Sequence, residues 1–336
     1  MSEAGIRRLA VIGAGAWGTA LATAARRAGS ETVLWAREAE VADSVNADHE
    51  NPIFLPGVAL DAAIRATNDV AEAVREADAV LLVAPAQHLR SVAGQLEPHV
   101  GGDTPVVICS KGIERQSAAL MSEVTAAALP GRPLAVLSGP TFAREVADDR
   151  PTAVTLAAED PEIGEALIAA LGSRRFRPYL GDDLVGAQIG GAVKNVIAIA
   201  CGIVAGRGMG ANARAALITR GLAEIARLAA AKGAYAETLM GLSGLGDLTL
   251  TATDSQSRNY SLGEELGRGR VLQEIVGERR SVAEGVHTAE AVLSLAERLG
   301  VDMPITESID AVLNRGAGLE EMIEALLARP FKSEAR

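Results

Sequence analysis

The chain has 336 residues, more than one small hydrophobic core can hold, so we expect two domains. Apolar residues make up 49% and charged residues 22%, as in globular proteins, and a net charge of -11 argues against a surface for DNA or RNA. The two cysteines, Cys109 and Cys201, suggest no disulfide framework and fit a reducing cytoplasm.

Short apolar runs alternate with helical patterns in the first half of the chain. The runs are nearly unbroken, as in strands of a parallel sheet that is buried on both faces. The predicted strands are Arg8–Ile12, Thr32–Trp35, Val80–Ala84, Val106–Cys109, Leu134–Leu137 and Ala153–Leu156. Helix-length segments lie between them, among them Trp17–Ala28 and Ser117–Ala128. The alternation predicts an α/β fold with an N-terminal Rossmann-type doubly wound sheet and right-handed crossovers.

The first predicted strand runs into a glycine-rich turn with the pattern Gly-x-Gly-x-x-Gly, at Gly13, Gly15 and Gly18. In such a turn the first glycine allows the tight bend, the second lets the backbone approach a pyrophosphate, and the third lets helix and strand pack closely. The N–H groups at the helix start then face the anion. The flanking strand and helix favour dinucleotide binding over a plain turn, and a nicotinamide over a flavin, although the turn alone does not decide between those two.

The second predicted strand ends at Trp35, near the place where an acid holds a ribose hydroxyl in dinucleotide folds. Arg37 and Glu38 follow it. Arg37 suits a 2′-phosphate and stacking on adenine, which favours NADP, whereas Glu38 suits the free hydroxyl of NAD. A solvated Arg37–Glu38 pair is the alternative to both.

Two further turns follow predicted strands at the carboxyl edge of the sheet, where open α/β folds bind ligands. Lys111 lies in VVICSKGIE, and Gly139 and Thr141 lie in LAVLSGPTFA. A shared site is one interpretation, and a surface lysine beside an ordinary turn is the other.

Strand patterns stop near residue 185, and the second half reads as an all-α C-terminal domain. The predicted helices are Ala187–Ala205, Ala213–Ala230, Thr288–Leu299 and a last one through Leu319 and Leu327. We therefore divide the chain into a dinucleotide-binding domain, residues 1–185, and a helical substrate and catalytic domain, residues 186–336.

Lys194 is the single charged side chain between Leu184 and Gly206. A charge in so apolar a helix is costly unless it is paired or functional. Burial lowers the pKa of a lysine, which suits a proton donor and acceptor near neutrality. A lysine that snorkels to the surface is the alternative; the isolation of Lys194 and the adjacent Asn195 favour function.

Residues 241–263 mix glycines with polar side chains and are predicted to be a long irregular segment. Arg258 and Asn259 suit a phosphate, and Asp247 suits a lysine or a substrate hydroxyl. A solvated linker is the alternative.

Other features limit the class of protein. The four histidines, His49, His88, His99 and His287, lack metal-ligand spacing, so we expect no metal. The start MSEAGIRRLAVIG lacks a charged leader followed by a cleavable apolar block. The most apolar stretch, Val193 to Val204, is too short for a bilayer and contains a lysine. We therefore expect a soluble cytoplasmic protein without stable membrane insertion.

Nine motifs occur in a fixed order: GAGAWGTA, LWAR, NPIFLPG, SKGIE, SGPTFA, GAVKNVIAIACGI, GLGDLTLT, SRNYSLG and VAEGVHTA. From about Leu9 to the C-terminal helices the chain resembles the bacterial NAD(P)-dependent glycerol-3-phosphate dehydrogenases. The resemblance implies reversible reduction of dihydroxyacetone phosphate to sn-glycerol 3-phosphate for phospholipid synthesis, with NADP(H) or NAD(H) as cofactor and a small phosphorylated substrate.

The resemblance also implies residue roles. Lys194 matches the catalytic proton acceptor, with Lys111 and Asp247 beside it in the catalytic set. Matches to substrate contacts are Lys111, Gly139, Thr141, Lys194, Asp247, Ser257, Arg258 and Asn259. Matches to cofactor contacts are Gly13, Gly15, Ala16, Trp17, Gly18, Arg37, Lys111, Ala143, Arg258, Val282 and Glu284. Ala16 departs from the family, because many relatives carry a serine there, which puts one hydrogen bond to a phosphate in doubt.

These roles predict a mechanism. Hydride moves to the ketone carbon while Lys194 supplies the proton, and Lys111 adds positive charge that also lowers the pKa of Lys194. Two other functions stay open: another Rossmann-type hydroxyacid dehydrogenase, and an NADPH-sensing regulator without catalysis. The apolar helices suit either a homodimer interface or a domain core.

Overall fold

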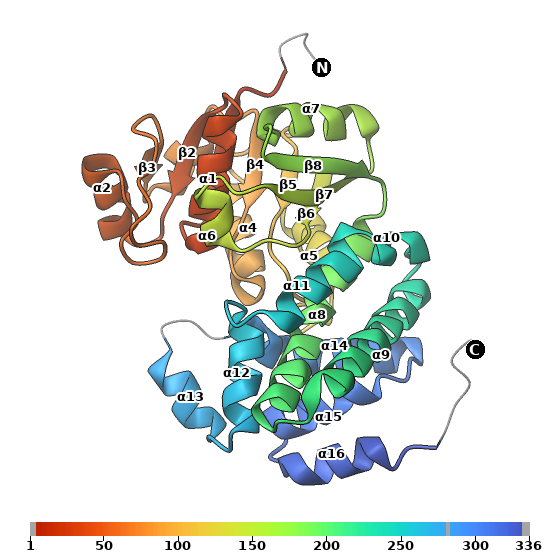
Figure 1. The fold of residues 1–336 in the computed structure, drawn as a ribbon. Coiled ribbons are helices and arrows are strands. Elements are labelled where there is room, and N and C mark those ends of the chain that lie inside the picture. Colours follow the sequence, from red (N-terminus) through yellow and green to blue (C-terminus); the bar gives the residue numbers. More distant parts are fainter. Residues whose placement is uncertain (1–4, 280–282, 331–336) are drawn as a thin grey trace.

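The computed structural model describes residues 5–279 and 283–330, and it divides into a sheet-containing half and a helical half (Figure 1). One eight-stranded sheet has the order β3-β2-β1-β4-β5-β6-β7-β8. The strands are β1 (Arg8–Ile12), β2 (Glu31–Trp35), β3 (Arg65–Thr67), β4 (Ala79–Leu82), β5 (Val106–Ile108), β6 (Leu134–Ser138), β7 (Thr152–Ala158) and β8 (Phe176–Gly181).

The apolar strands are buried on both faces, as predicted. Along β1, Leu9 and Val11 join the core on one face of the sheet, and Ala10 and Ile12 join the core on the other. In the part of the sheet with the order β3-β2-β1-β4-β5-β6, each strand is parallel to the next one. The predicted α/β doubly wound sheet is therefore confirmed.

One strand pair departs from the parallel arrangement that we predicted. β7 is antiparallel to β6, with Ser138 opposite Thr155 and Ala135 opposite Ala158. The chain enters β7 at the carboxyl end of β6, so this pair needs no crossover. The two outermost strands, β3 and β8, were not predicted, because Arg-Ala-Thr and Phe-Arg-Pro-Tyr-Leu-Gly lack an unbroken apolar run.

The helices of the first half cover the sheet (Figure 1). They are α1 (Ala16–Arg27), α2 (Ala39–Asp48), α3 (Val70–Val74), the short η1 (Ala86–His88), α4 (Leu89–Leu96), α5 (Met121–Ala128), α6 (Ala143–Ala147) and α7 (Pro161–Leu171). The helix predicted over Ser117–Ala128 begins only at Met121. Residues before it turn instead, because Ala118 has a φ of 54° and the Glu123 carboxylate accepts the N–H of Leu120 at the helix start.

The described residues of the second half form helices joined by turns, without a strand, as predicted. Its helices are α8 (Leu184–Gly206), α9 (Gly210–Ala231), α10 (Ala236–Met240), the π-helix η2 (Leu242–Gly246), α11 (Asp247–Thr253), α12 (Arg258–Gly267), α13 (Leu272–Glu278), α14 (Glu284–Leu299), α15 (Pro304–Asn314) and α16 (Leu319–Leu327). The division at residues 185 and 186 stays a prediction; α8 begins at Leu184.

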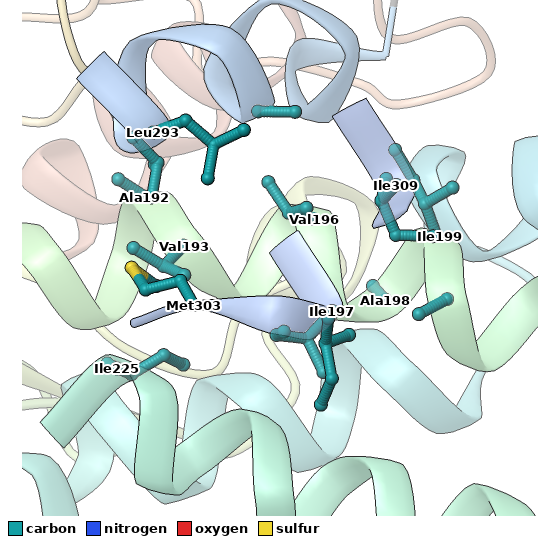
Figure 2. Packing of buried hydrophobic residues seen from close by; sticks show 14 of the residues in the cluster. Ala192, Val193, Val196, Ile197, Ala198, Ile199, Ile225, Leu293, Met303 and Ile309 are labelled. Carbon is teal, nitrogen blue, oxygen red and sulfur yellow. The ribbon is translucent and has the colours of Figure 1, made fainter. Parts of the chain in front are cut away.

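Helix α8 forms the core of this half. Figure 2 shows its apolar side chains packed among Ile225 of α9, Leu293 of α14 and Ile309 of α15. The helix has 23 residues, and the mean hydropathy of its most apolar 18-residue window is 1.7, so by length and composition the whole helix could cross a membrane, whereas the expectation concerned the shorter stretch Val193 to Val204. However, 89% of its most apolar window is buried inside the protein, and no membrane insertion is indicated.

The segment 241–263 is not irregular, contrary to our prediction. It forms η2, α11 and the first part of α12. Glycines and short polar residues have weak helix propensity, but packing against α8 overrides it. A Cβ at Gly263 would overlap the carbonyl oxygen of Ile199, so α12 approaches α8 more closely than any other residue would allow.

Candidate active site

The glycine turn between β1 and α1 has the geometry of a phosphate cradle. Gly13 has a φ of +123°, and a Cβ there would lie 3.0 Å from the carbonyl oxygen of Val83. A Cβ at Gly18 would overlap the carbonyl oxygen of Gly13. At Gly15 a Cβ would meet nothing within 4 Å, so the backbone there is open to a ligand.

The start of α1 suits an anion. Gly15 is the N-cap and provides no side-chain cap, and the first turn, which begins at Ala16, carries no acidic residue. Its first N–H groups therefore remain available to an anion, and the helix dipole favours negative charge there. The buried indole Nε1 of Trp17 also has no hydrogen-bond partner. These features fit the pyrophosphate of a dinucleotide.

Arg37 and Glu38 form an ion pair just beyond the end of β2. The Arg37 Nε and Nη2 donate to Glu38 Oε1 at 2.9 and 2.6 Å. The side chain of Arg37 is 77% exposed, which leaves its outer face accessible to a 2′-phosphate. The preference for NADP over NAD stays a prediction.

A cluster of two lysines and one aspartate joins the two halves of the chain. The buried Lys194 on α8 donates to Asp247 Oδ1, and Lys111, after β5, donates to Asp247 Oδ2 at 2.6 Å. Asp247 begins α11 and is fully buried, whereas the side chains of Lys194 and Lys111 are 6% and 17% exposed. Lys194 does not snorkel to the surface.

Two further polar contacts complete the cluster. Lys194 donates to the hydroxyl of Thr251 at 2.8 Å, one turn beyond Asp247. Lys111 donates to the carbonyl oxygen of Gly139 at 2.9 Å, which brings together the two strand-end turns singled out in the sequence. Thr141 lies in the second of these turns, and its hydroxyl donates to the same carbonyl at 3.3 Å. Ala143 follows as the first residue of α6.

The cluster sets two lysines against one carboxylate, so it carries an excess positive charge whenever both amines are protonated. Burial lowers the pKa of Lys194 to about 7; Asp247 opposes this shift and Lys111 adds to it. At neutral pH the Lys194 amine therefore exists in both protonation states and can give or take a proton.

The start of α12 contributes three of the predicted substrate residues. The hydroxyl of Ser257 caps the helix by accepting the N–H of Tyr260 at 3.2 Å. Asn259 donates to Asn195 Oδ1 on α8 at 3.0 Å and accepts the N–H of Gly285 on α14 at 3.0 Å. Ser257 thus already caps α12, and Asn259 already joins α12 to α8 and α14; the contact of either side chain with a substrate stays a prediction.

A cleft of about 1080 Å³ lies between the two halves, lined by the loops after β4 and β5 and by α12 and α14. Arg258 and Glu284 line it, whereas Lys194 and Lys111 do not. Burial raises the pKa of Glu284 to about 6, against the opposing charges of Arg258, Lys111 and Lys194. Glu284 therefore links the cleft electrostatically to the lysine cluster.

Two residues of this region were not predicted from the sequence as site residues. Thr251 contacts Lys194, but a threonine in a polar stretch carries no distinguishing signal. Asn51 lies fully buried against the glycine turn, and its only signal was the loop motif NPIFLPG. Of the predicted cofactor residues, Val282 lies outside the described residues. Within 5–279 and 283–330, no group of three histidine, cysteine or carboxylate side chains could hold a metal ion.

The structure combines a dinucleotide cradle on a mostly parallel sheet with a helical domain, and a buried lysine bound to a carboxylate lies where they meet; this combination defines a class of protein. The class is the two-domain, nicotinamide-dependent dehydrogenases. Two family models, the NAD-dependent glycerol-3-phosphate dehydrogenase N-terminus and C-terminus, match residues 8–164 and 183–324. The chain belongs to the NAD-dependent glycerol-3-phosphate dehydrogenase family, and the resemblance inferred from its motifs is confirmed.

Individual relatives agree with this assignment. A glycerol-3-phosphate dehydrogenase [NAD(P)+] from Rhodospirillum rubrum is 63% identical over 98% of this chain and 94% of its own length. The crystal structure of a glycerol-3-phosphate dehydrogenase from Coxiella burnetii is 38% identical, with a TM-score of 0.92 over 96% of this chain and 99% of that one. A D-mandelate dehydrogenase bound to NADH is 14% identical, with a TM-score of 0.59 over 93% of this chain and 98% of its own, and shares the fold alone.

Proposed function

We propose that this chain catalyses the NAD(P)H-dependent, reversible reduction of dihydroxyacetone phosphate to sn-glycerol 3-phosphate, with Lys194 as the proton donor and acceptor. The observation that carries the proposal is the buried Lys194 amine, held by Asp247 and Thr251 and paired through Asp247 with Lys111. Membership of the dehydrogenase family supports the reaction, and the lowered pKa of Lys194 supports its role.

The cluster provides what a ketone reduction requires. NAD(P)H, when bound at the glycine turn, would supply the hydride for the ketone carbon, and negative charge would then develop on the ketone oxygen. Lys194 delivers a proton to that oxygen, while the ammonium group of Lys111 stabilises the developing charge. Asp247 orients both amines by accepting from each of them, one at each carboxylate oxygen. In the reverse direction the neutral Lys194 amine removes the hydroxyl proton.

Recognition of the phosphate falls to α12 in this proposal. Arg258 and Asn259 lie in the first turn of that helix, where the guanidinium group and the helix N-terminus both favour an anion. Binding energy from the phosphate then aligns the ketone with Lys194. The substrate is a small phosphorylated ketone, and we expect the enzyme to work in the cytoplasm and to supply the backbone of phospholipids.

A substrate panel tests the proposal. The purified protein is mixed with NADPH or NADH and with dihydroxyacetone phosphate, dihydroxyacetone or a 2-oxo acid, and the fall in reduced cofactor absorbance is followed. We expect turnover with dihydroxyacetone phosphate, faster with NADPH than with NADH, and a loss of kcat/KM of about a thousandfold or more without the phosphate. Faster turnover of the oxo acid, or cofactor binding without turnover, would assign the chain instead to a hydroxyacid dehydrogenase or to a sensor.

A further inference from the structure

The loop NPIFLPG, residues 51–57, packs against the glycine turn although neither the cofactor nor the substrate assignments include it. Asn51, at its start, is fully buried. Its Nδ2 donates to the carbonyl oxygen of Ala14 and to the hydroxyl of Thr19, each at 2.8 Å, and its Oδ1 accepts the N–H of Phe54 at 3.1 Å. Both N–H groups of this amide thus reach the turn and α1, while its oxygen accepts a hydrogen bond within the loop.

We propose that Asn51 is a positioning residue for the dinucleotide: it holds the Ala14 carbonyl and thereby aims the N–H of Gly15 at the pyrophosphate. The inference rests on the proposed use of NAD(P)H, and it assigns a role to a side chain that does not itself touch the cofactor.

The planarity of the peptide group couples the Ala14 carbonyl to the Gly15 N–H. The carbonyl of Ala14 and the N–H of Gly15 belong to one trans peptide, so they point in opposite directions and rotate together. Asn51 and the Thr19 hydroxyl both donate to that carbonyl, at 2.8 and 3.3 Å. Fixing the carbonyl on the side of the loop therefore fixes the N–H on the opposite side.

Gly15 makes such a restraint necessary. Glycine lacks the Cβ that limits backbone rotation, and open space surrounds the position that a Cβ would take. Without the hydrogen bond from Asn51, the peptide between Ala14 and Gly15 could rotate at little steric cost. The Gly15 N–H would then no longer be directed at the pyrophosphate. A pre-aimed donor lowers the entropy that cofactor binding must overcome.

The loop is itself held firmly enough to act as a support. Leu55 N–H donates to the Asn51 carbonyl at 3.0 Å, and Gly57 N–H donates to Glu50 Oε1 at 2.7 Å. At the far end, Arg144 of α6 donates to the carbonyl oxygen of Pro56 at 2.8 Å. The loop is therefore fixed to the turn at one end and to α6 at the other.

The experiment compares Asn51→Ala with Asn46→Ala by fluorescence titration of NADPH, thermal unfolding and steady-state kinetics. Asn46 is the matched control, because it also bridges backbone groups, donating to and accepting from Ala66 at 2.8 Å, but away from the glycine turn. Thr19→Val is the second variant, since it removes one donor to the Ala14 carbonyl, together with one acceptor of Asn51, and keeps the Asn51 amide that donates to the same carbonyl.

We expect Asn51→Ala to raise the Kd and KM for NADPH about tenfold while the KM for dihydroxyacetone phosphate changes less than twofold. Thr19→Val should raise the Kd about threefold, and Asn46→Ala should leave it unchanged. If Asn51→Ala binds NADPH as the wild type does, or lowers only the unfolding temperature, Asn51 merely supports the fold. If it does not fold, wild-type affinity in Thr19→Val overturns the inference. Failure of the wild type itself to bind NADPH would refute the proposed function instead.

Discussion

At the scale of single residues, the site depends on what sets the pKa of the buried Lys194 amine. A lysine with no partner in this apolar setting would lose its proton well below neutral pH. Asp247 opposes that shift because its negative charge raises the pKa of Lys194. Lys111 limits this rise because its positive charge lowers the same pKa. The result is a pKa of about 7, at which a proton can be exchanged in either direction of the reaction.

The pH dependence of the two directions follows from that pKa. Reduction needs the protonated amine, so its kcat/KM should fall about tenfold for each pH unit above 7. Oxidation of glycerol 3-phosphate needs the neutral amine, so its kcat/KM should rise up to about pH 7 and then level off. Initial rates from pH 5.5 to 9 in both directions measure this. Profiles that run parallel in the two directions would exclude Lys194 as the titrating group.

At the scale of elements, small residues bring the catalytic helices together. Helix α8 carries Lys194, and α12 carries Arg258 and Asn259. The two helices touch where Gly263 meets the carbonyl oxygen of Ile199 and Gly202 meets that of Tyr260. Side chains at these positions would force the helices apart and move the first turn of α12, the proposed phosphate site, away from the Lys194 amine.

A pair of glycine substitutions tests this packing. Gly263→Ala should lower the free energy of unfolding by about 3 kcal/mol, because its Cβ would overlap the Ile199 backbone. Gly277→Ala in α13 meets nothing within 4 Å and should raise the free energy of unfolding by up to about 1 kcal/mol through better helix propensity. Urea denaturation measures the free energy of unfolding of both variants. Equal effects of the two substitutions would mean that close packing of α8 and α12 is not required.

The sequence predicted the elements with strong, regular patterns and missed those that tertiary packing decides. The central strands were predictable because a short, continuous apolar run is compatible with few structures other than a strand buried on both faces. The edge strand β8 was missed because Phe176 alone among its residues is buried and the strand includes a proline. Residues 241–263 were predicted irregular because their propensity for a helix is weak, and only contact with α8 makes them helical.

The same distinction holds for the site. Lys194 was identified because a charge within an apolar helix is unusual in any fold. Thr251 and Asn51 were not identified as site residues, because polar residues within polar segments are common, and only the fold brings them to the lysine and to the glycine turn. Arg37 was identified, but its pairing with Glu38 leaves the choice of cofactor to experiment.

At the scale of the whole molecule, the two halves contribute different parts of one reaction. The sheet provides the glycine turn and Lys111, and the helical half provides Lys194, Asp247 and Arg258. The chain carries a net charge of -11, yet it sets Lys111 and Lys194 on one carboxylate, where the proposed oxyanion would be stabilised. Cofactor binding and proton transfer should therefore be separable by mutation.

Lys194→Met tests that separation most directly, since methionine keeps the length of the side chain and removes the amine. The variant and the wild type are compared by NADPH fluorescence titration and by kcat for dihydroxyacetone phosphate reduction. We expect kcat to fall about a thousandfold while the Kd for NADPH stays within twofold of the wild type. A variant that keeps wild-type kcat would contradict the account, because proton transfer would then not depend on Lys194.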